Sequence, residues 1–218
     1  ANGEEGIRKA IESVPDIIVS DIMMPVMDGI RMLGVIKNDL RTSHIPVVLL
    51  TARADISSRL EGLESGADAY IAKPFNSEEL RVQVRTLVAL RKKLQERYTP
   101  IDHLILPEDK NYLFEDKFMN QVREIMMSNL ANEALDIPHI CQALSLSRTQ
   151  LYRKFRSLTN LTVTQYLLML RLHKARSILS GKKVTVAEAA YKTGFRNVSH
   201  FSRTFTKEFG INPSELLR

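Results

Sequence analysis

The sequence predicts two domains, an α/β domain with a parallel sheet followed by an all-α domain. Short apolar runs alternate with helical segments up to about residue 90, as in parallel-sheet proteins. A helix–turn–helix pattern then occurs twice, displaced by about fifty residues. The charge is divided in the same way. Residues 1–114 hold 15 Lys and Arg against 17 Asp and Glu, a net of −2, whereas residues 115–218 hold 16 against 8, a net of +8.

The α/β half consists of short strands separated by helices. The run at Ile17–Val19 is typical of a strand buried on both faces, and Pro46–Leu50 and Ala69–Ala72 are the next two strands. Because helices lie between the strands, we expect parallel pairing through right-handed crossovers. The helices are expected at Glu4–Ser13, at Ile30–Leu40, near Ser57–Ser65, and after a cap formed by Asn76 and Glu79.

Polar residues follow each of the three strands: Asp21, Thr51 and Lys73. The carboxyl ends of parallel strands meet at one edge of a sheet, so we expect these side chains to lie close together. A carboxylate, a hydroxyl and an ammonium group there can form a phosphoryl-transfer site with Asp21 as the nucleophile. From spacing alone, a structural ion pair between Asp21 and Lys73 is an equal alternative.

The second helix–turn–helix unit occupies the carboxyl end. A helix at Val198–Phe209 places its apolar residues on one stripe. Thr185 and Glu188 have the spacing of a capping box for the preceding helix, and Gly194 suits the left-handed residue that ends it. The stripe contains Val198, Phe201, Phe205 and Phe209, and the opposite face carries Asn197, Ser199, His200, Arg203 and Lys207.

The first unit repeats this arrangement. Asp136 begins its first helix, Ser147 and Gln150 form the capping box of its second, and one long helix at Val163–Ser180 leads to the other unit. Asn160 falls where Gly210 does and tolerates the same left-handed backbone. On the second helix, Leu151, Phe155 and Leu158 are expected to point inward, whereas Arg148, Thr149, Gln150, Arg153 and Lys154 are expected to remain outside.

Both outer faces are polar and basic, and both are expected to be open to a DNA groove. Cationic domains bind polyanions through counterion release, which favours nucleic acid as the partner. The alternative is a protein-interaction module with an incidental basic excess. Residues expected nearest to base edges are Arg148, Thr149, Gln150, Asn197, Ser199, His200 and Arg203; those expected at phosphates are Arg153, Lys154 and Lys207.

The stretch GFRNVSHFSRTFTKEFGINP at 194–213 and the repeated unit before it resemble AraC-type DNA-binding domains. The resemblance covers residues 116–218. It implies two helix-turn-helix units joined by a long helix and a double-stranded DNA partner.

The motifs DIMMPVMDG at 21–29, TA at 51–52 and AYIAKPF at 69–75 resemble the receiver domains of two-component response regulators. The resemblance covers residues 1–90. It implies Asp21 as the phosphoacceptor, Thr51 as the hydroxyl that senses the phosphoryl group, and Lys73 before a cis Pro74. Tyr70 holds the position of the aromatic switch residue, although a half-buried strand tyrosine is the commoner use.

The receiver resemblance is incomplete. The family's flavodoxin-like sheet begins with two strands and an acidic pair for Mg²⁺ that this sequence does not contain. Asp21 and the carbonyl of Met23 are its recognisable metal ligands, so Mg²⁺ is implied for an intact receiver and not expected to bind here. The incomplete set of metal ligands predicts poor phosphate acceptance. The expected bare edge strand, Asp16–Ser20, predicts self-association.

Residues 91–115 are expected to be a helical extension and, from Thr99, a linker. This order resembles the carboxyl-terminal part of hybrid two-component regulators, which implies a histidine kinase, separate or in the same polypeptide, as partner and leaves a homodimer open. An aspartyl-phosphate hydrolase would need a second acidic cluster, so no enzyme is expected. The lone Cys141, expected to be buried, and the lack of a membrane-length apolar run predict a cytoplasmic segment without membrane contact. The sequence thus predicts a DNA-binding transcription regulator controlled by aspartyl phosphorylation.

Overall fold

A computed structural model describes residues 2–52, 67–99, 109, 112–132, 135–181 and 184–217. The expected helix near Ser57–Ser65 lies outside these residues. Within the described parts, the chain divides into two compact units. The first contains residues up to 99 together with 109–118 and 146–160, and the second contains 119–145 and 161–217.

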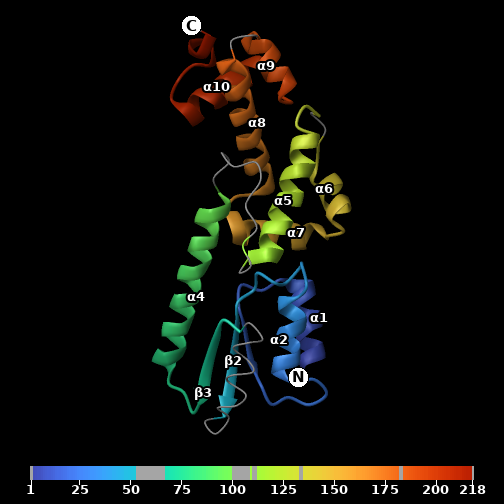
Figure 1. Cartoon of the computed structure of the whole chain (residues 1–218), viewed down its shortest axis with the longest axis vertical. Coiled ribbons are helices and arrows are strands. Elements are labelled where there is room, and N and C mark those ends of the chain that lie inside the picture. The colour runs from blue at the N-terminus through green and yellow to red at the C-terminus, as the bar shows by residue number, and fades with distance from the viewer. Residues whose placement is uncertain are drawn as a thin grey trace. The chain divides into compact units, whose positions relative to one another are not determined.

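The first unit is built on a three-stranded parallel sheet with the strand order β1-β2-β3 (Figure 1). Val19 of one strand pairs with Val48 of the next, and Leu49 pairs with Tyr70. The parallel pairing expected from the alternation of strands and helices is confirmed. The strands are β1 (Ile18–Asp21), β2 (Val47–Ala52) and β3 (Ala69–Lys73).

Helices cover the two faces of this sheet. Helices α1 (Gly3–Ser13) and α2 (Gly29–Lys37) lie on one face, and α4 (Ser77–Tyr98) lies on the other (Figure 1). Successive side chains of a strand point to opposite faces. Accordingly, Val47 and Leu49 pack with Ala10, Met32, Leu33 and Ile36, whereas Val48 packs with Leu87.

Strand β1 departs from the prediction. Its Val19 is 46% exposed, so the expectation of a strand buried on both faces is wrong for β1. The reason is that, within the described parts of the chain, β1 pairs with a strand on one side only, and the α4 face of the sheet is packed over β2 and β3. The apolar edge expected at this strand is therefore present among the described residues.

Helix α2 is shorter than expected because a hydrogen-bonded turn follows it. The helix ends at Lys37 rather than at Leu40. Asp39 Oδ1 accepts a hydrogen bond from the Arg41 amide (2.8 Å), and Thr42 Oγ1 donates to the carbonyl oxygen of Ile36 (2.9 Å). Side chains that bond nearby backbone groups compete with helix continuation. The turn places residues 39–43 beyond the amino ends of the strands.

We predict opposite effects for two alanine substitutions in α2. At Gly29, which follows the N-cap Asp28, a Cβ would overlap the carbonyl oxygen of Asp21 and lie 3.0 Å from Ile22 Cα. Gly29→Ala should therefore cost about 1–3 kcal/mol of unfolding free energy. Gly34→Ala meets no atom within 4 Å and should stabilise by about 0.5–1 kcal/mol. Urea unfolding followed by circular dichroism measures both, and a neutral Gly29→Ala would contradict the close approach.

Helix α5 (Leu113–Ser128) begins inside the range expected to be linker. That expectation is wrong for residues 113–115. The helix has buried apolar residues at three- and four-residue spacing, which is a helical period. The acidic residues and prolines that precede the helix made this period difficult to recognise in the sequence. The buried positions are Phe118, Met119, Val122 and Met126.

The remaining helices match the predicted pattern closely. Helix α7 (Arg148–Thr159) lies in the first unit, and the others lie in the second. The expected capping boxes at Ser147 and Thr185 are present, and Gly194, Gly210 and Asn160 have positive φ angles of 78°, 72° and 58°. The second unit contains α6 (Ile137–Leu144), α8 (Val163–Ser180), α9 (Val186–Lys192), α10 (Val198–Phe209) and the 3₁₀ helix η2 (Pro213–Leu217).

The core of the second unit is aromatic. Phe195, Phe201 and Phe205 pack with Leu172 and Ala189 from α8 and α9. Helix α6 is short and fully buries Ile140, whereas Cys141 is half-buried, so the expectation of a buried thiol is wrong. None of the described helices has both the length and the apolar character needed to cross a bilayer.

Candidate functional sites

The carboxyl edge of the sheet brings Asp21 and Lys73 together, as the strand order predicts. Asp21 ends β1 and Lys73 ends β3, and Asp21 Oδ2 lies 2.5 Å from Lys73 Nζ. Thr51, near the end of β2, is 2% exposed, and its Oγ1 donates to the carbonyl oxygen of Ala52 (3.2 Å). The described arrangement is therefore an ion pair between Asp21 on β1 and Lys73 on β3, with the Thr51 hydroxyl on β2, the strand between them.

The electrostatics of this edge favour an ionised Asp21. The hydrogen bond from Lys73 lowers the pKa of Asp21 most, burial opposes it, and the Lys73 charge and the amides of Met23 and Ile22 lower it further. The carboxylate is 39% exposed, so solvent reaches it. An ionised, accessible carboxylate is the form that a phosphoacceptor needs.

Removing the Lys73 charge is expected to raise the pKa of Asp21 towards its ordinary value. Because this pKa is lowered by folding, the pair stabilises above the ordinary Asp range and loses its contribution as the pH falls through the folded pKa. Lys73→Met tests this, with the exposed Lys92→Met as control. A ¹³Cγ NMR titration of Asp21 measures the pKa. An equal pKa in wild type and Lys73→Met would show that another group controls it.

Two further receiver positions are described by the structure. The Lys73–Pro74 peptide bond is cis, as the resemblance implies. Tyr70 is half-buried in β3, burial raises its pKa, and its buried hydroxyl has no hydrogen-bond partner among the described residues. A buried hydroxyl without an acceptor costs free energy. A rearrangement that gave the Tyr70 hydroxyl an acceptor would therefore be favourable.

The oxygen atoms at this edge do not form a complete magnesium site. Asp21 is bound to Lys73 and to main-chain amides, and Met23 supplies a carbonyl from an exposed residue. Mg²⁺ requires near-octahedral oxygen coordination. Across the part of the chain that the structure describes, no three or more His, Cys, Asp or Glu residues are grouped so as to hold a metal.

Helix α10 has the two faces that its sequence predicts. Phe201 and Phe205 are fully buried. Asn197 caps the helix, because its Oδ1 accepts a hydrogen bond from the His200 amide (2.9 Å) and leaves its amide nitrogen for other contacts. Every side chain expected to contact DNA from this helix is exposed: Asn197, Ser199, His200, Arg203 and Lys207.

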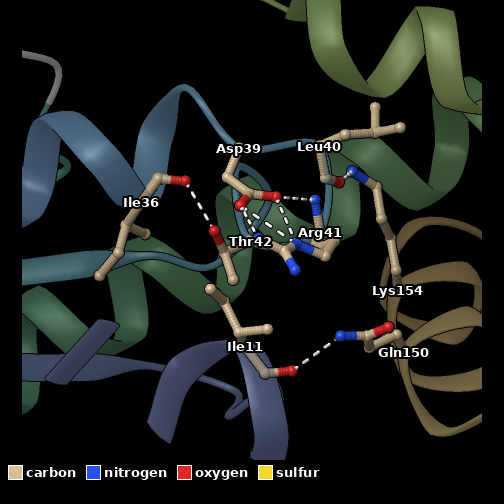
Figure 2. Close-up of polar contacts among 8 residues, drawn as sticks. All are labelled: Ile11, Ile36, Asp39, Leu40, Arg41, Thr42, Gln150 and Lys154. Atoms are coloured by element: carbon tan, nitrogen blue, oxygen red, sulfur yellow. Dashed lines mark hydrogen bonds and ion pairs between the residues drawn. The ribbon is translucent and has the colours of Figure 1, made fainter. Parts of the chain in front are cut away.

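Helix α7 differs from α10. Leu151, Phe155 and Leu158 are buried as predicted, and Arg148, Thr149 and Arg153 are exposed. Gln150, however, is half-buried, and Lys154 is 1% exposed. The expectation that the whole outer face is open is therefore wrong for α7. Figure 2 shows the cause, because Gln150 and Lys154 form hydrogen bonds to the α/β part of the first unit.

Sequence reasoning missed these partners on the α/β side. Three of them are main-chain carbonyl groups, those of Ile11, Val14 and Leu40. Every residue has a carbonyl group, so no residue type marks such a partner. The available signal was the position of Ile11 near the end of a predicted helix, where carbonyl groups lack helical partners.

Comparisons with known proteins identify both domains. Residues 1–85 match the family model of the response regulator receiver domain, and residues 140–218 match that of a helix-turn-helix domain. Histidine kinase P4 from Formosa agariphila is 36% identical over 214 residues, which are 98% of this chain and 16% of that protein. The chain thus spans about one sixth of the length of this curated relative.

Two solved structures resemble separate parts of the chain. The receiver domain of a sensor histidine kinase from Pseudomonas aeruginosa, with a magnesium ion in its active-site cleft, is 32% identical, with a TM-score of 0.37, over 40% of this chain and 73% of that one. A probable AraC family transcriptional regulator from Rhodopseudomonas palustris is 28% identical, with a TM-score of 0.41, over 44% of this chain and 91% of that one. From the two family models, the chain joins a response regulator receiver domain to an AraC-type helix-turn-helix domain.

Proposed function

We propose that this chain is a sequence-specific DNA-binding transcription regulator of a two-component phosphorelay, controlled by phosphorylation of Asp21. The observation that carries the proposal is the arrangement of α10. Its apolar stripe is buried in the aromatic core, which fixes the helix, and its polar side chains are exposed. A fixed helix with such a face can enter a major groove.

The exposed side chains of α10 suit two kinds of DNA contact. Arg203 can donate two parallel hydrogen bonds to a guanine, and Asn197, Ser199 and His200 can donate to other base edges. Lys207 lies one turn beyond Arg203 and suits a phosphate. Among the described residues, neither Arg203 nor Lys207 forms a salt bridge with a carboxylate, so both charges are available to DNA. From α7 we assign Arg148, Thr149 and Gln150 to bases and Arg153 and Lys154 to phosphates.

Selection of bound sites from a random DNA pool tests this function and supplies a duplex for titration. With that duplex, Arg203→Ala should cost about 1–3 kcal/mol of binding free energy and relax base preference at one position. Lys207→Ala should weaken binding to all sequences alike and reduce the salt slope by about 1. The exposed Lys174→Ala, in α8, is the matched control and should leave both quantities unchanged.

Two outcomes would contradict this assignment. Recovery of no enriched sequence, with equal weak binding to every duplex, would favour the rival function in which the helical half binds another protein. An unchanged salt slope in Lys207→Ala would remove that residue from the phosphate contacts. A DNA ligand and a lone cysteine both agree with a cytoplasmic location.

For the receiver domain, we propose that Asp21 accepts a phosphoryl group from a histidine kinase, separate or in the same polypeptide. Lys73 and Thr51 would bind the phosphoryl oxygens, and Tyr70 would respond to the movement of Thr51. Mg²⁺ would be held by Asp21, by the Met23 carbonyl and by ligands beyond those present here. This chain alone should therefore label poorly with acetyl phosphate. Efficient labelling of Asp21 would contradict the incomplete metal site. A homodimer on DNA is part of the same proposal.

A further inference from the structure

Helix α7 directs three of its outer side chains onto the α/β part of the first unit, and Figure 2 shows two of them, Gln150 and Lys154. All three lie on the face that the sequence assigns to DNA. Their partners belong to two segments at the amino ends of the strands, residues 11–14 and 40–43. Gln150 Nε2 donates to Ile11 O (3.1 Å), Arg153 Nη1 donates to Val14 O (3.3 Å), and Lys154 Nζ donates to Leu40 O and to Ser43 Oγ (3.3 Å).

The acceptors form a surface with partial negative charge. Ile11 lies in the last turn of α1, where carbonyl groups have no amide partner within the helix. The carboxyl end of a helix also carries the negative end of its dipole. Leu40 lies in the turn that follows α2. We call the carbonyl oxygens of Ile11, Val14 and Leu40, with Ser43 Oγ, the docking surface.

Lys154 is the most completely enclosed of the three donors. Its side chain is 1% exposed, and its ammonium lies 4.8 Å from the centre of the Phe118 ring. Burial lowers its pKa to about 8, and the carboxylates of Glu115 and Asp39 oppose this. Ser43 Oγ, in turn, donates to Glu115 Oε1 (2.6 Å). The ammonium is therefore compensated by several partners, and a DNA phosphate cannot reach it in this position.

The docking surface and DNA present the same kind of partner to the side chains of α7. Both provide oxygen atoms that accept hydrogen bonds and carry negative charge or partial negative charge. We propose that the docking surface is an intramolecular binding site for the DNA-facing side of α7, and that α7 must leave it to contact DNA. This inference rests on the proposed function. It makes docking and DNA binding mutually exclusive for Gln150 and Lys154, so docking lowers the apparent affinity of the whole chain for DNA.

The contact itself can be tested without DNA. In the full chain, a limiting amine-reactive reagent followed by peptide mass spectrometry should label Lys154 at least about tenfold more slowly than the exposed Lys207. Ser43→Arg places a second cation beside the Lys154 ammonium and should release α7, so that Lys154 labels as fast as Lys207. Thr86→Arg adds the same charge at an exposed position of α4 and should leave the Lys154 rate unchanged.

The competition is tested by titrating the same three proteins with one mixed-sequence duplex at fixed salt. Ser43→Arg should bind about tenfold more tightly than wild type, and Thr86→Arg should stay within about twofold. Wild type gives a further readout that needs no variant. Saturation with the duplex should speed hydrogen exchange at residues 39–46, because α7 no longer covers them.

Each outcome decides a separate point. Rapid labelling of Lys154 in wild type would overturn the contact. Release of Lys154 in Ser43→Arg without tighter DNA binding than Thr86→Arg would overturn the competition. Should Ser43→Arg fail to fold, unchanged exchange at 39–46 on adding DNA to wild type would overturn the competition, and faster exchange would support it. Failure of all three proteins to bind DNA would overturn the proposed function and the competition together, while labelling still reports the contact.

Discussion

Phe201→Ala is expected to destabilise the second unit by about 3–5 kcal/mol and to abolish DNA binding by α10. The Phe201 side chain is fully buried, and its ring centre lies 5.0 Å from that of Phe195 and 5.4 Å from that of Phe205. Removing the ring leaves a cavity and also loses the edge-on contact with Phe195. Because this cluster holds α10 against α8 and α9, the exposed face of α10 should lose its fixed orientation.

Urea unfolding of the chain measures this loss. The sequence has no tryptophan, so far-UV circular dichroism is the appropriate probe, with hydrogen exchange of α8 and α10 peptides to assign the transition to the second unit. Tyr191→Ala is the matched control, since this aromatic residue of α9 is 54% exposed and its loss should change stability by about 0.5 kcal/mol or less. Equal stabilities of the two variants would show that the cluster does not hold α10.

Asp116→Ala is expected to cost the first unit about 3–5 kcal/mol, because it leaves buried partners without their acceptor. The carboxylate is fully buried. It accepts hydrogen bonds from Arg97 Nη2 (2.9 Å), Tyr98 Oη (2.8 Å) and the Asp109 amide (2.8 Å). Burial and then Asp116 raise the pKa of Tyr98, and the hydrogen bond to Asp116 raises the pKa of Arg97.

Asp116 lies near the start of α5 and accepts hydrogen bonds from Arg97 and Tyr98 at the end of α4. Its loss should therefore increase the mobility of both helix ends. Hydrogen exchange of peptides covering 91–99 and 112–118 measures this directly, alongside urea unfolding. Glu96→Ala is the control, because Glu96 is an exposed acidic residue of α4. If Asp116→Ala exchanged no faster than Glu96→Ala in these peptides, the network would have no structural role.

Features determined by short-range sequence were the predictable ones. The capping boxes at Ser147 and Thr185 depend on residues three positions apart, and the left-handed Asn160 and Gly210 depend on single residues. The meeting of Asp21 with Lys73 was also predictable, although 52 residues separate them. Parallel strands leave little choice about which of their ends meet.

The wrong predictions concern which side chains are covered by other parts of the protein. Periodicity assigned Val19 to a strand and Lys154 to the polar side of a helix, and both assignments are correct. It could not show that Val19 lies beyond the helix-covered part of the sheet. Nor could it show that Leu40 O, Ser43 Oγ and the Phe118 ring surround the Lys154 ammonium. Coverage depends on contacts between residues far apart in sequence, and those contacts leave no local pattern.

The main-chain character of the docking surface has a consequence for how this protein tolerates substitution. Replacing the side chain of Ile11, Val14 or Leu40 leaves each carbonyl oxygen in place, provided that the helix end or turn is kept. Random mutation of the α/β half should therefore seldom release α7 unless it also unfolds the domain. Variants in which α7 is released and DNA binding is permanently stronger should instead arise from bulky or cationic replacements next to those oxygens, as at Ser43.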